Sequence, residues 1–355
     1  MGYSFIHIAP KPALRGSVMI NLIILVSSFS IINLKAQDIH FSQFYAAPLL
    51  TNPANTGMSG ENFRIANNYR NQWAKIGVPF ETFCTSIDKK LIILNQAFGV
   101  GGLVIHDQSS SYNLSANEFF LSLSYSRIIN NQLITIGLQP GFVYKSYNLK
   151  DLTFGTQFDP LSELYNSNMP TLESGLDDHL HYFDLNFGIF WSTLLEKFIP
   201  SAGISVNHLN IPLQKFSTSS SGTRLPPRIT LNSEVIVPFR SKIDLIPRIL
   251  YSYTPGATEL LLGSTGNYSL EKSFITVKEL YAAAMVRINP VRNIDAMIFG
   301  GGVKFMNFDI GLTYDFNISP LRKATNFNGA FEISLIYIGG KHARKSIYQP
   351  CFIIN

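Results

Sequence analysis

The octapeptide FFLSLSYS, Phe119–Ser126, alternates strictly between two kinds of side chain. Its odd-numbered positions are apolar or aromatic, whereas serine fills the even-numbered positions after Phe120. Successive side chains of a β-strand point to opposite faces, so a period of two indicates a strand. One face of this strand is apolar and the other is mostly small and polar.

The same alternation recurs along most of the chain. Near the C-terminus, Phe308, Ile310 and Leu312 alternate with Asp309 and Gly311. Such segments predict about 14 strands, an even number as a single-chain bacterial barrel requires. They cover residues 63–71, 80–90, 97–107, 116–128, 132–147, 182–192, 201–207, 228–237, 242–253, 258–268, 278–288, 296–305, 308–317 and 328–338.

The low charge content separates two folds that share this pattern. In a soluble β-sandwich the apolar faces point inward and the outer faces carry many charges, whereas in an outer-membrane barrel the apolar faces contact lipid. Only 14% of the 355 residues are charged and 13% are aromatic. We therefore predict an all-β fold, a single antiparallel transmembrane β-barrel of about 14 strands. A soluble secreted β-protein that binds glycans is the weaker alternative.

The lengths of the connections predict how the barrel is oriented. If the N-terminus is periplasmic, the connections after even-numbered strands are periplasmic and should be short. The two longest connections, Asn148–His181 and His208–Pro227, both follow odd-numbered strands and would be extracellular. Tight turns follow even-numbered strands at Ile129–Gln132, Pro238–Ser241 and Met306–Asn307. The short odd-side turn Thr254–Ala257 and the long even-side connection Leu270–Val277 depart from this rule.

The first 36 residues read as an export signal. Lys11 and Arg15 precede an apolar run, Val18–Leu34, which ends at the small residue Ala36. This order of charged, apolar and small residues is typical of a secretory signal, so we expect cleavage near Ala36. A true transmembrane helix is the alternative, because the run is close to spanning length. After cleavage the protein would be a multi-pass barrel in the outer membrane.

Composition argues against two further classes. The net charge is only +5 and the basic residues are scattered, whereas nucleic-acid binding needs a concentrated basic face. The chain has two cysteines, Cys84 and Cys351, so a disulfide scaffold is excluded and a single bridge between them stays open.

No motif predicts catalysis. The richest polar cluster is DDHLH, with Asp177, Asp178, His179 and His181, which could bind a metal but is more typical of a solvated loop end. There is no G-x-S-x-G elbow, and the glycines of Gly99–Gly102 lie inside a predicted strand without the sequence of a phosphate loop. We expect no enzyme activity, no cofactor and no metal.

Residues Gln37–Gly57, QDIHFSQFYAAPLLTNPANTG, lack the strand alternation. Pro48 and Pro53 cannot donate to a ladder, yet the aromatic residues of the segment need burial. We expect this segment to fold back as a plug or lid in the periplasmic mouth of the barrel, with turns at Asn52-Pro53 and Thr56-Gly57. A strap along the outer rim is the alternative.

Several motifs, in order and at matching spacing, resemble one family. The opening FSQFYAAPLLTNPANTG is similar to the pattern F-S-Q-Y-x-x-x-P-x-x-x-N-P-A-x-x-G at Phe41, Ser42, Gln43, Pro48, Asn52, Pro53, Ala54 and Gly57. Further matches are YRNQW (69–73), DQSS (107–110), LTFGTQFD (152–159), YFDLNFG (182–188), HLNIP (208–212), YDFNIS (314–319), FEISLIY (331–337) and PCF (350–352). Together they resemble the PorP/SprF family of outer-membrane proteins, associated with type IX secretion and gliding in Bacteroidota. His40 stands where the family usually has an acidic or amide residue.

The resemblance implies a non-enzymatic outer-membrane barrel component of type IX secretion. Its expected parts are a signal peptide (1–36), a plug or lid (37–61), the barrel (62–338) and a periplasmic tail (339–355). Such a protein would work with the type IX translocon and periplasmic motor-complex proteins, and would support export or cell-surface attachment of a large cargo such as a gliding adhesin.

Two sets of residues are candidates for this function. The plug motif comprises Phe41, Ser42, Gln43, Pro48, Asn52, Pro53 and Gly57. The cargo-facing candidates on the two long connections are Asp177, Asp178, His179, His181, Leu209 and Arg224, because loops carry recognition. The alternative function is a diffusion or uptake channel for small or hydrophobic solutes, which a continuous water-lined lumen would support and a plugged lumen would not.

Overall fold

A computed structural model describes residues 38–59, 63–74, 78–109, 114–147, 155–159, 164–166, 169, 178–215, 222–270, 277–290 and 293–339. The expected signal peptide and the tail from residue 340, with Cys351, lie outside these described residues. Within them, no helix has both the length and the apolar character that crossing a membrane requires.

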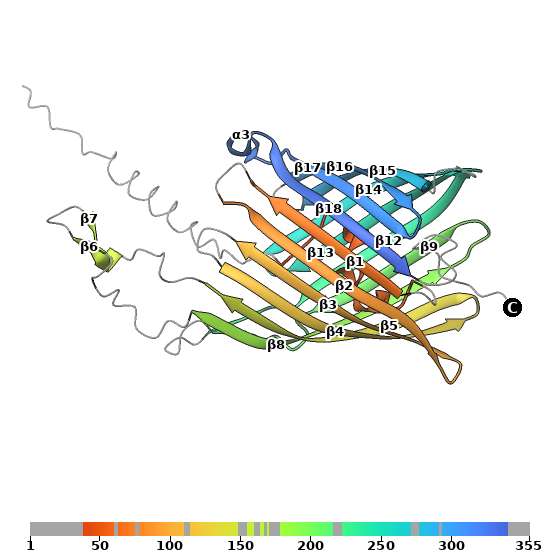
Figure 1. The fold of residues 1–355 in the computed structure, drawn as a ribbon, viewed down its shortest axis with the longest axis horizontal. Helices are drawn as coiled ribbons and strands as arrows, with labels where there is room; N and C mark the ends of the chain where they lie inside the picture. Colours follow the sequence, from red (N-terminus) through yellow and green to blue (C-terminus); the bar gives the residue numbers. More distant parts are fainter. Residues whose placement is uncertain are drawn as a thin grey trace, which may run out of the picture. The chain divides into compact units, whose positions relative to one another are not determined.

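The described chain forms a closed antiparallel barrel (Figure 1), which confirms the predicted fold. Each strand pairs with its neighbours in sequence, and the first strand pairs with the last to close the cylinder. The barrel strands are β1 (Phe63–Gln72), β2 (Phe80–Ile93), β3 (Gln96–Ser109), β4 (Leu114–Ile129), β5 (Gln132–Ser146), β8 (His179–Thr193), β9 (Ile199–Asn207), β12 (Arg228–Arg240), β13 (Ile243–Thr254), β14 (Ala257–Ser269), β15 (Val277–Asn289), β16 (Asn293–Phe305), β17 (Phe308–Asn317) and β18 (Asn328–Gly339).

The apolar faces of the strands point outward. In β4, Phe119 and Leu121 are 51% and 52% exposed, whereas Ser122 is fully buried on the lumen side. The same contrast holds in β17, where Leu312 is exposed and Thr313 is buried. An outward apolar band with a small, polar interior is the pattern of a membrane barrel, because lipid replaces the protein core as the apolar environment.

The short and long connections lie at opposite ends of the barrel. Asn130 and Asn131, both with positive φ, join β4 to β5, as suits the backbone of a two-residue hairpin turn. The connection from β5 to β8 contains the short ladder β6 (Phe158–Asp159) and β7 (Leu164–Tyr165). The connection from β9 to β12 contains β10 (Leu213–Gln214) and β11 (Thr223–Arg224). One boundary differs from expectation, because β8 begins at His179 and takes both histidines of DDHLH out of the loop.

Residues Asp38–Ser59, here called the inner segment, lie inside the barrel and are drawn in red in Figure 1. The segment folds into short helical turns, η1 (Phe44–Ala46), α2 (Pro48–Thr51) and η2 (Pro53–Asn55). Proline begins the last two turns, where its missing N–H needs no partner.

The inner segment extends through the lumen instead of lying only at its mouth. Asp38 contacts His208, just beyond the last residue of β9 at the end with the long connections. Gly57 lies against Gly99 and Asp88, close to the tight turn between β2 and β3 at the opposite end. The segment is neither a strap outside the rim nor a lid confined to the short-connection mouth.

One wall of the lumen is apolar, which differs from the expectation of small, polar inner faces. Inward-facing residues of β2, β3, β4, β5 and β8 form a buried cluster with Phe41 and Ala47 of the inner segment. The wall residues of this cluster are Cys84, Leu103, Ile105, Phe120, Val143, Leu180 and Tyr182. These apolar side chains avoid water because the inner segment covers them.

Candidate functional site

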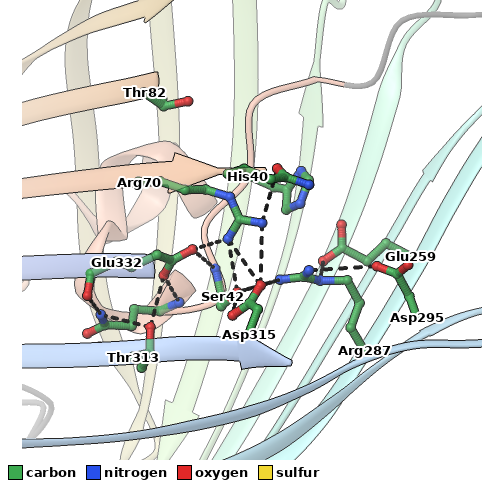
Figure 2. A network of polar contacts seen from close by, with 12 residues as sticks. His40, Ser42, Arg70, Thr82, Glu259, Arg287, Asp295, Thr313, Asp315 and Glu332 are labelled. Carbon is green, nitrogen blue, oxygen red and sulfur yellow. Dashed lines mark hydrogen bonds and ion pairs between the residues drawn. The ribbon is translucent and has the colours of Figure 1, made fainter. Parts of the chain in front are cut away.

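Glu332 on β18 binds two successive peptide groups of the inner segment. Its Oε1 accepts the Ser42 N–H at 2.7 Å and its Oε2 accepts the Gln43 N–H at 2.9 Å. Arg70 on β1 donates to the same carboxylate in a close ion pair. Figure 2 shows Glu332 with Ser42 and Arg70 beside it. One carboxylate thus fixes both the position and the direction of the Ser-Gln backbone.

Asp315 on β17 forms the second centre of this network. Its two carboxylate oxygens accept the Ser42 hydroxyl, each at 2.8 Å. Arg287 on β15 donates to Asp315 at 2.7 Å, and the Nη1 of Arg70 lies 3.4 Å away. Both guanidinium groups also donate to the Ser42 hydroxyl oxygen, which is therefore fully used as donor and acceptor.

The charges of this network are deeply buried and balanced by neighbours. Arg70, Asp315 and Glu332 have side chains that are at most 2% exposed. Arg287 has further acidic neighbours, with Glu259 at 3.5 Å and Asp295 at 3.7 Å. A charge removed from water needs such partners, so loss of one member leaves an uncompensated buried charge. We call Arg70, Arg287, Asp315 and Glu332, which all bind Ser42, the charged anchor.

Gln43 completes the polar contacts of the F-S-Q motif. Its Nε2 donates to the Thr313 hydroxyl at 3.1 Å, and its Oε1 accepts the Ser334 hydroxyl at 2.9 Å. Phe41 points to the opposite side and packs in the apolar wall, where it is 4% exposed. Three consecutive residues therefore bind two chemically different walls of the barrel.

The N-P-A turn occupies a second set of contacts, nearer the short connections. The Asn52 Oδ1 accepts the Ala54 N–H at 2.9 Å, while its Nδ2 donates to the carbonyls of Ile189 and Ile204 at 3.0 and 3.3 Å. Asn52 thus caps its own turn and bridges β8 and β9.

Glycines in the wall make room for this part of the segment. A Cβ added to Gly137 on β5 or to Gly99 on β3 would meet the backbone of Pro53 or Thr56 below the closest distance of real Cβ atoms. A Cβ at Gly188 on β8 would collide with the Asn52 side chain. Close backbone approach is one of the reasons for glycine within a strand.

A separate ion pair holds the end of the inner segment. Arg64 on β1 and Asp88 on β2 pair at 2.8 Å, and both side chains are at most 2% exposed. Asp88 accepts the Gly57 N–H at 2.7 Å, and Arg64 donates to the Asn55 carbonyl at 3.0 Å. Gly57 has a φ of 74°, which favours glycine at this position.

At the other end, His208 holds the beginning of the segment. Its Nδ1 lies 2.7 Å from Asp184 on β8, and its Nε2 lies 3.5 Å from Asp38. Burial lowers the pKa of His208, but the hydrogen bonds and charges of Asp184 and Asp38 outweigh burial and raise it to about 9. Arg228 on β12 also donates to the Ile39 carbonyl at 3.0 Å.

Most of the predicted motif residues come together in the lumen, but the predicted cargo-facing residues do not form one site. The inner segment carries all of Phe41, Ser42, Gln43, Pro48, Asn52, Pro53 and Gly57. His179 and His181 instead lie on the outer face of β8, where their rings pack against Tyr144 and Phe142.

The remaining cargo-facing candidates lie on the surface. Asp178 is exposed and lies 2.7 Å from His179, and Leu209 and Arg224 are exposed on the other long connection. Asp177 lies outside the described residues. Among the residues that the structure describes, no group of three or more His, Cys, Asp or Glu side chains is arranged to hold a metal ion.

None of the charged-anchor residues was predicted from the sequence, although three of them lie in motifs shared with the family. Arg70 lies in YRNQW, Asp315 in YDFNIS and Glu332 in FEISLIY. The available signal was a charge between two large apolar residues of an alternating strand, as in Glu332 between Phe331 and Ile333. Such a charge faces the lumen and therefore needs a partner there.

Solved structures support the fold. The chain is similar to the toluene transporter TbuX of Ralstonia pickettii, with 10% identity, a TM-score of 0.50, and coverage of 84% of this chain and 94% of that chain. It is equally similar to the monoaromatic hydrocarbon channel CymD, with 12% identity, a TM-score of 0.50 and the same coverage. At these identities the likeness concerns the fold alone.

The comparison with protein families covers most of the chain. No curated protein matches the sequence. The sequence pattern of the type IX secretion system membrane protein PorP/SprF matches residues 33–337, which include the inner segment and the barrel up to β18. The chain belongs to the PorP/SprF family of type IX secretion system membrane proteins.

Proposed function

We propose that this protein is a non-conducting outer-membrane component of type IX secretion that supports export or surface attachment of one large cargo, such as a gliding adhesin. The observation that carries the proposal is the occupied lumen. The inner segment forms hydrogen bonds with β1, β2, β4, β5, β8, β9, β12, β15, β17 and β18. A channel needs a continuous water path, which a segment bound on all sides interrupts.

Small spaces border the inner segment. One cavity has a volume of about 60 Å³ and is lined by residues such as Phe44, Met58 and Phe190. Another has a volume of about 30 Å³, near Phe41 and Arg228. A water needs about 10–15 Å³ of such volume, so these spaces hold a few waters each.

The barrel fold and the family both fit an outer-membrane location, after cleavage of the signal peptide near Ala36. The long connections then face the outside, because the short turns of such barrels are periplasmic. In this orientation the exposed residues Asp178, Leu209 and Arg224 are available to cargo, while the short-connection side faces the translocon and motor-complex partners.

Electrical recordings test the closed lumen. The purified protein is inserted into planar bilayers and compared with a variant that lacks residues 41–57. We expect no steady conductance from the wild type and open channels from the deletion variant, because removal of the segment leaves a water-filled lumen. Steady conductance of the wild type, or unchanged barrel assembly, stability and conductance after the deletion, would contradict the proposal.

Loop replacement in cells tests the cargo role. Residues 149–177 and 210–226 are replaced, separately and together, by short Gly-Ser turns, and surface-attached cargo is measured on intact cells. We expect loss of surface cargo from the double variant with normal amounts of barrel in the outer membrane. A matched control replaces the periplasmic-side connection 271–276. Normal cargo attachment in the double variant would refute a role of these loops.

A diffusion channel is the second candidate function, favoured by the fold that the chain shares with hydrocarbon channels. Uptake of a small polar solute such as a pentose sugar into lipid vesicles distinguishes the two, because a bilayer alone excludes sugars whereas it dissolves toluene. The secretion proposal predicts equal uptake by vesicles with and without the wild-type protein. The fold and family are those of a secretion or channel protein, and we propose no enzymatic activity.

A further inference from the structure

The barrel wall is incomplete at the end with the long connections, between β8 and β12. β5 pairs with β8 along its full length, from His179 to Thr193. β9 is shorter and pairs with β8 only from Phe187 to Ser192. The N-terminal half of β8, before Phe187, therefore has one backbone edge without a barrel strand beside it.

The loop His208–Pro212, the HLNIP motif, covers part of this edge. The Leu209 N–H donates to the Leu185 carbonyl at 2.8 Å. The Asn210 side chain then donates through Nδ2 to the Phe183 carbonyl at 2.7 Å and accepts the Leu185 N–H through Oδ1 at 3.1 Å. The Asn210 carboxamide makes the two bonds that one residue of a neighbouring parallel strand would make.

The covering loop is strained and apolar. His208 and Ile211 have φ values of 57° and 48°, and this left-handed conformation is unfavourable for β-branched isoleucine. Leu209, Ile211 and Leu213 are exposed, next to the exposed ring of Phe183 on β8. A ligand that displaces the loop would release backbone strain and cover apolar surface.

The part of β8 that lacks a barrel neighbour on one edge extends past the length of a membrane-spanning strand. β8 has 15 residues, whereas a tilted transmembrane strand needs about 9–11. Open sheet edges do not occur within the hydrocarbon layer. The portion without a barrel strand beside this edge, His179–Leu185, therefore lies at or beyond the membrane interface on the side of the long connections. There β10 contacts β8, and the Gln214 Nε2 donates to the Tyr182 hydroxyl at 3.2 Å.

We propose that the β8 edge His179–Leu185 is a docking site for one extended segment of a partner polypeptide, which pairs with β8 in place of Asn210. Only a polypeptide backbone offers donors and acceptors at the spacing of a strand edge. The apolar residues beside the edge select a segment with alternating apolar side chains. This inference rests on the proposed function, because it takes the exported cargo as the partner.

Photo-crosslinking in cells tests the proposal. The photoreactive residue p-benzoylphenylalanine replaces Ile211, or replaces Phe299 on the outward face of β16 as a control that is also exposed. We expect crosslinks from position 211 to an exported polypeptide, identified by mass spectrometry, with adducts at alternate residues of one segment. We expect only background from position 299.

Two substitutions should change the crosslink yield in opposite directions. Asn210→Ala frees the edge and should raise the yield about tenfold, as two ordinary hydrogen bonds no longer compete. Phe183→Pro removes an edge N–H and should reduce the yield to background. The Phe183 carbonyl points toward the loop and away from β5. The N–H and the carbonyl of one strand residue point to the same side, so the Phe183 N–H does not bind β5 either. Proline at this position therefore keeps the hydrogen bonds between β5 and β8.

Asn210→Asp provides a second variant if the alanine variant misfolds, because aspartate keeps the acceptor for Leu185 but lacks the donor for Phe183. Heat-dependent mobility in gels verifies that each barrel is folded. Crosslinks from position 211 only to lipid, to a second copy of this chain or to non-exported proteins overturn the proposal. So does an unchanged yield in both Asn210→Ala and Phe183→Pro.

Surface cargo, measured in cells with these variants, distinguishes a failure of this inference from a failure of the proposed function. If Phe183→Pro leaves surface cargo normal while replacement of the long connections abolishes it, the β8 edge is not the docking site but the cargo function stands. If cargo attachment survives loop replacement but is lost in Phe183→Pro, the β8 edge and not the loops holds the cargo. If cargo attachment survives both changes, the cargo function itself is wrong.

Discussion

The two walls of the lumen hold the same tripeptide by different means. The apolar wall around Cys84 and Phe120 surrounds Phe41, while the charged anchor on β1, β15, β17 and β18 binds Ser42 and Gln43. The apolar wall needs only complementary volume, because dispersion and burial have no fixed direction. The charged wall needs every partner present, because each buried charge has lost its water. Substitutions on the charged wall should therefore have the larger effects.

Glu332→Ala should have the largest effect. It leaves Arg70 with a weakened set of partners and removes the acceptor of two peptide N–H groups. We expect a loss of about 3–5 kcal/mol in the free energy of unfolding, the range for breaking a buried ion pair. Guanidinium unfolding in lipid vesicles measures it. Glu81→Ala, on the outer side of the neighbouring β2, is the matched control and should lose less than about 1 kcal/mol.

Phe41→Ala should have a smaller effect on the apolar wall. The loss of a buried ring leaves a cavity and should cost about 3 kcal/mol. Because Cys84 packs in the same cluster, its reaction with a maleimide should become faster in a Cys351→Ser background. Phe41→Leu, which fills most of the volume, is the control. Equal labelling of Cys84 in all three proteins would show that Phe41 does not seal this wall.

Substitution of two glycines of β3 allows the lumen to be compared with the lipid face. Gly99 touches the backbone of Thr56, whereas a Cβ at Gly102 would meet nothing closer than 3.8 Å. We expect Gly99→Ala to lower the free energy of unfolding by about 2 kcal/mol, because overpacking displaces the inner segment. Gly102→Ala should be nearly neutral. Equal effects of the two substitutions would mean that the segment does not press on this wall.

A pH series tests the His208 contact, for which we expect the smallest effect. The folded pKa of about 9 lies above the ordinary value of 6.5, so the folded protein holds the proton more tightly. The stabilisation is therefore fully present below about pH 6.5 and is lost as the pH rises through about 9. We expect the stability difference between wild type and His208→Gln to shrink by about 1–2 kcal/mol over this range. A difference that does not change with pH would contradict the raised pKa.

The strands and their outward faces were predictable because alternation is local. Phe119, Ser122 and the other residues of β4 follow a period of two that needs no knowledge of the rest of the chain. Low charge then distinguished lipid from water outside the barrel. The positions of the long connections followed from strand parity, although His179 and His181 belong to β8 and not to the preceding loop.

The lumen was less predictable because its contacts are distant in sequence. Ser42 and Glu332 are separated by 290 positions, and alternation says only that Glu332 faces inward. The inward direction of Phe120 was also visible, but not the apolar cluster that it forms with residues from four other strands. Closure of the barrel decides which inward side chains meet, and single strands do not contain that information.

The amino-acid sequence by itself determined that the chain is a membrane barrel, because each strand must match its own two environments residue by residue. The family motifs marked Phe41, Ser42 and Gln43 without saying what they touch. Only the tertiary structure decided that these residues extend into the lumen and bind opposite walls. The reason is that buried charges and rings are stabilised by partners that only the closed cylinder brings within contact distance.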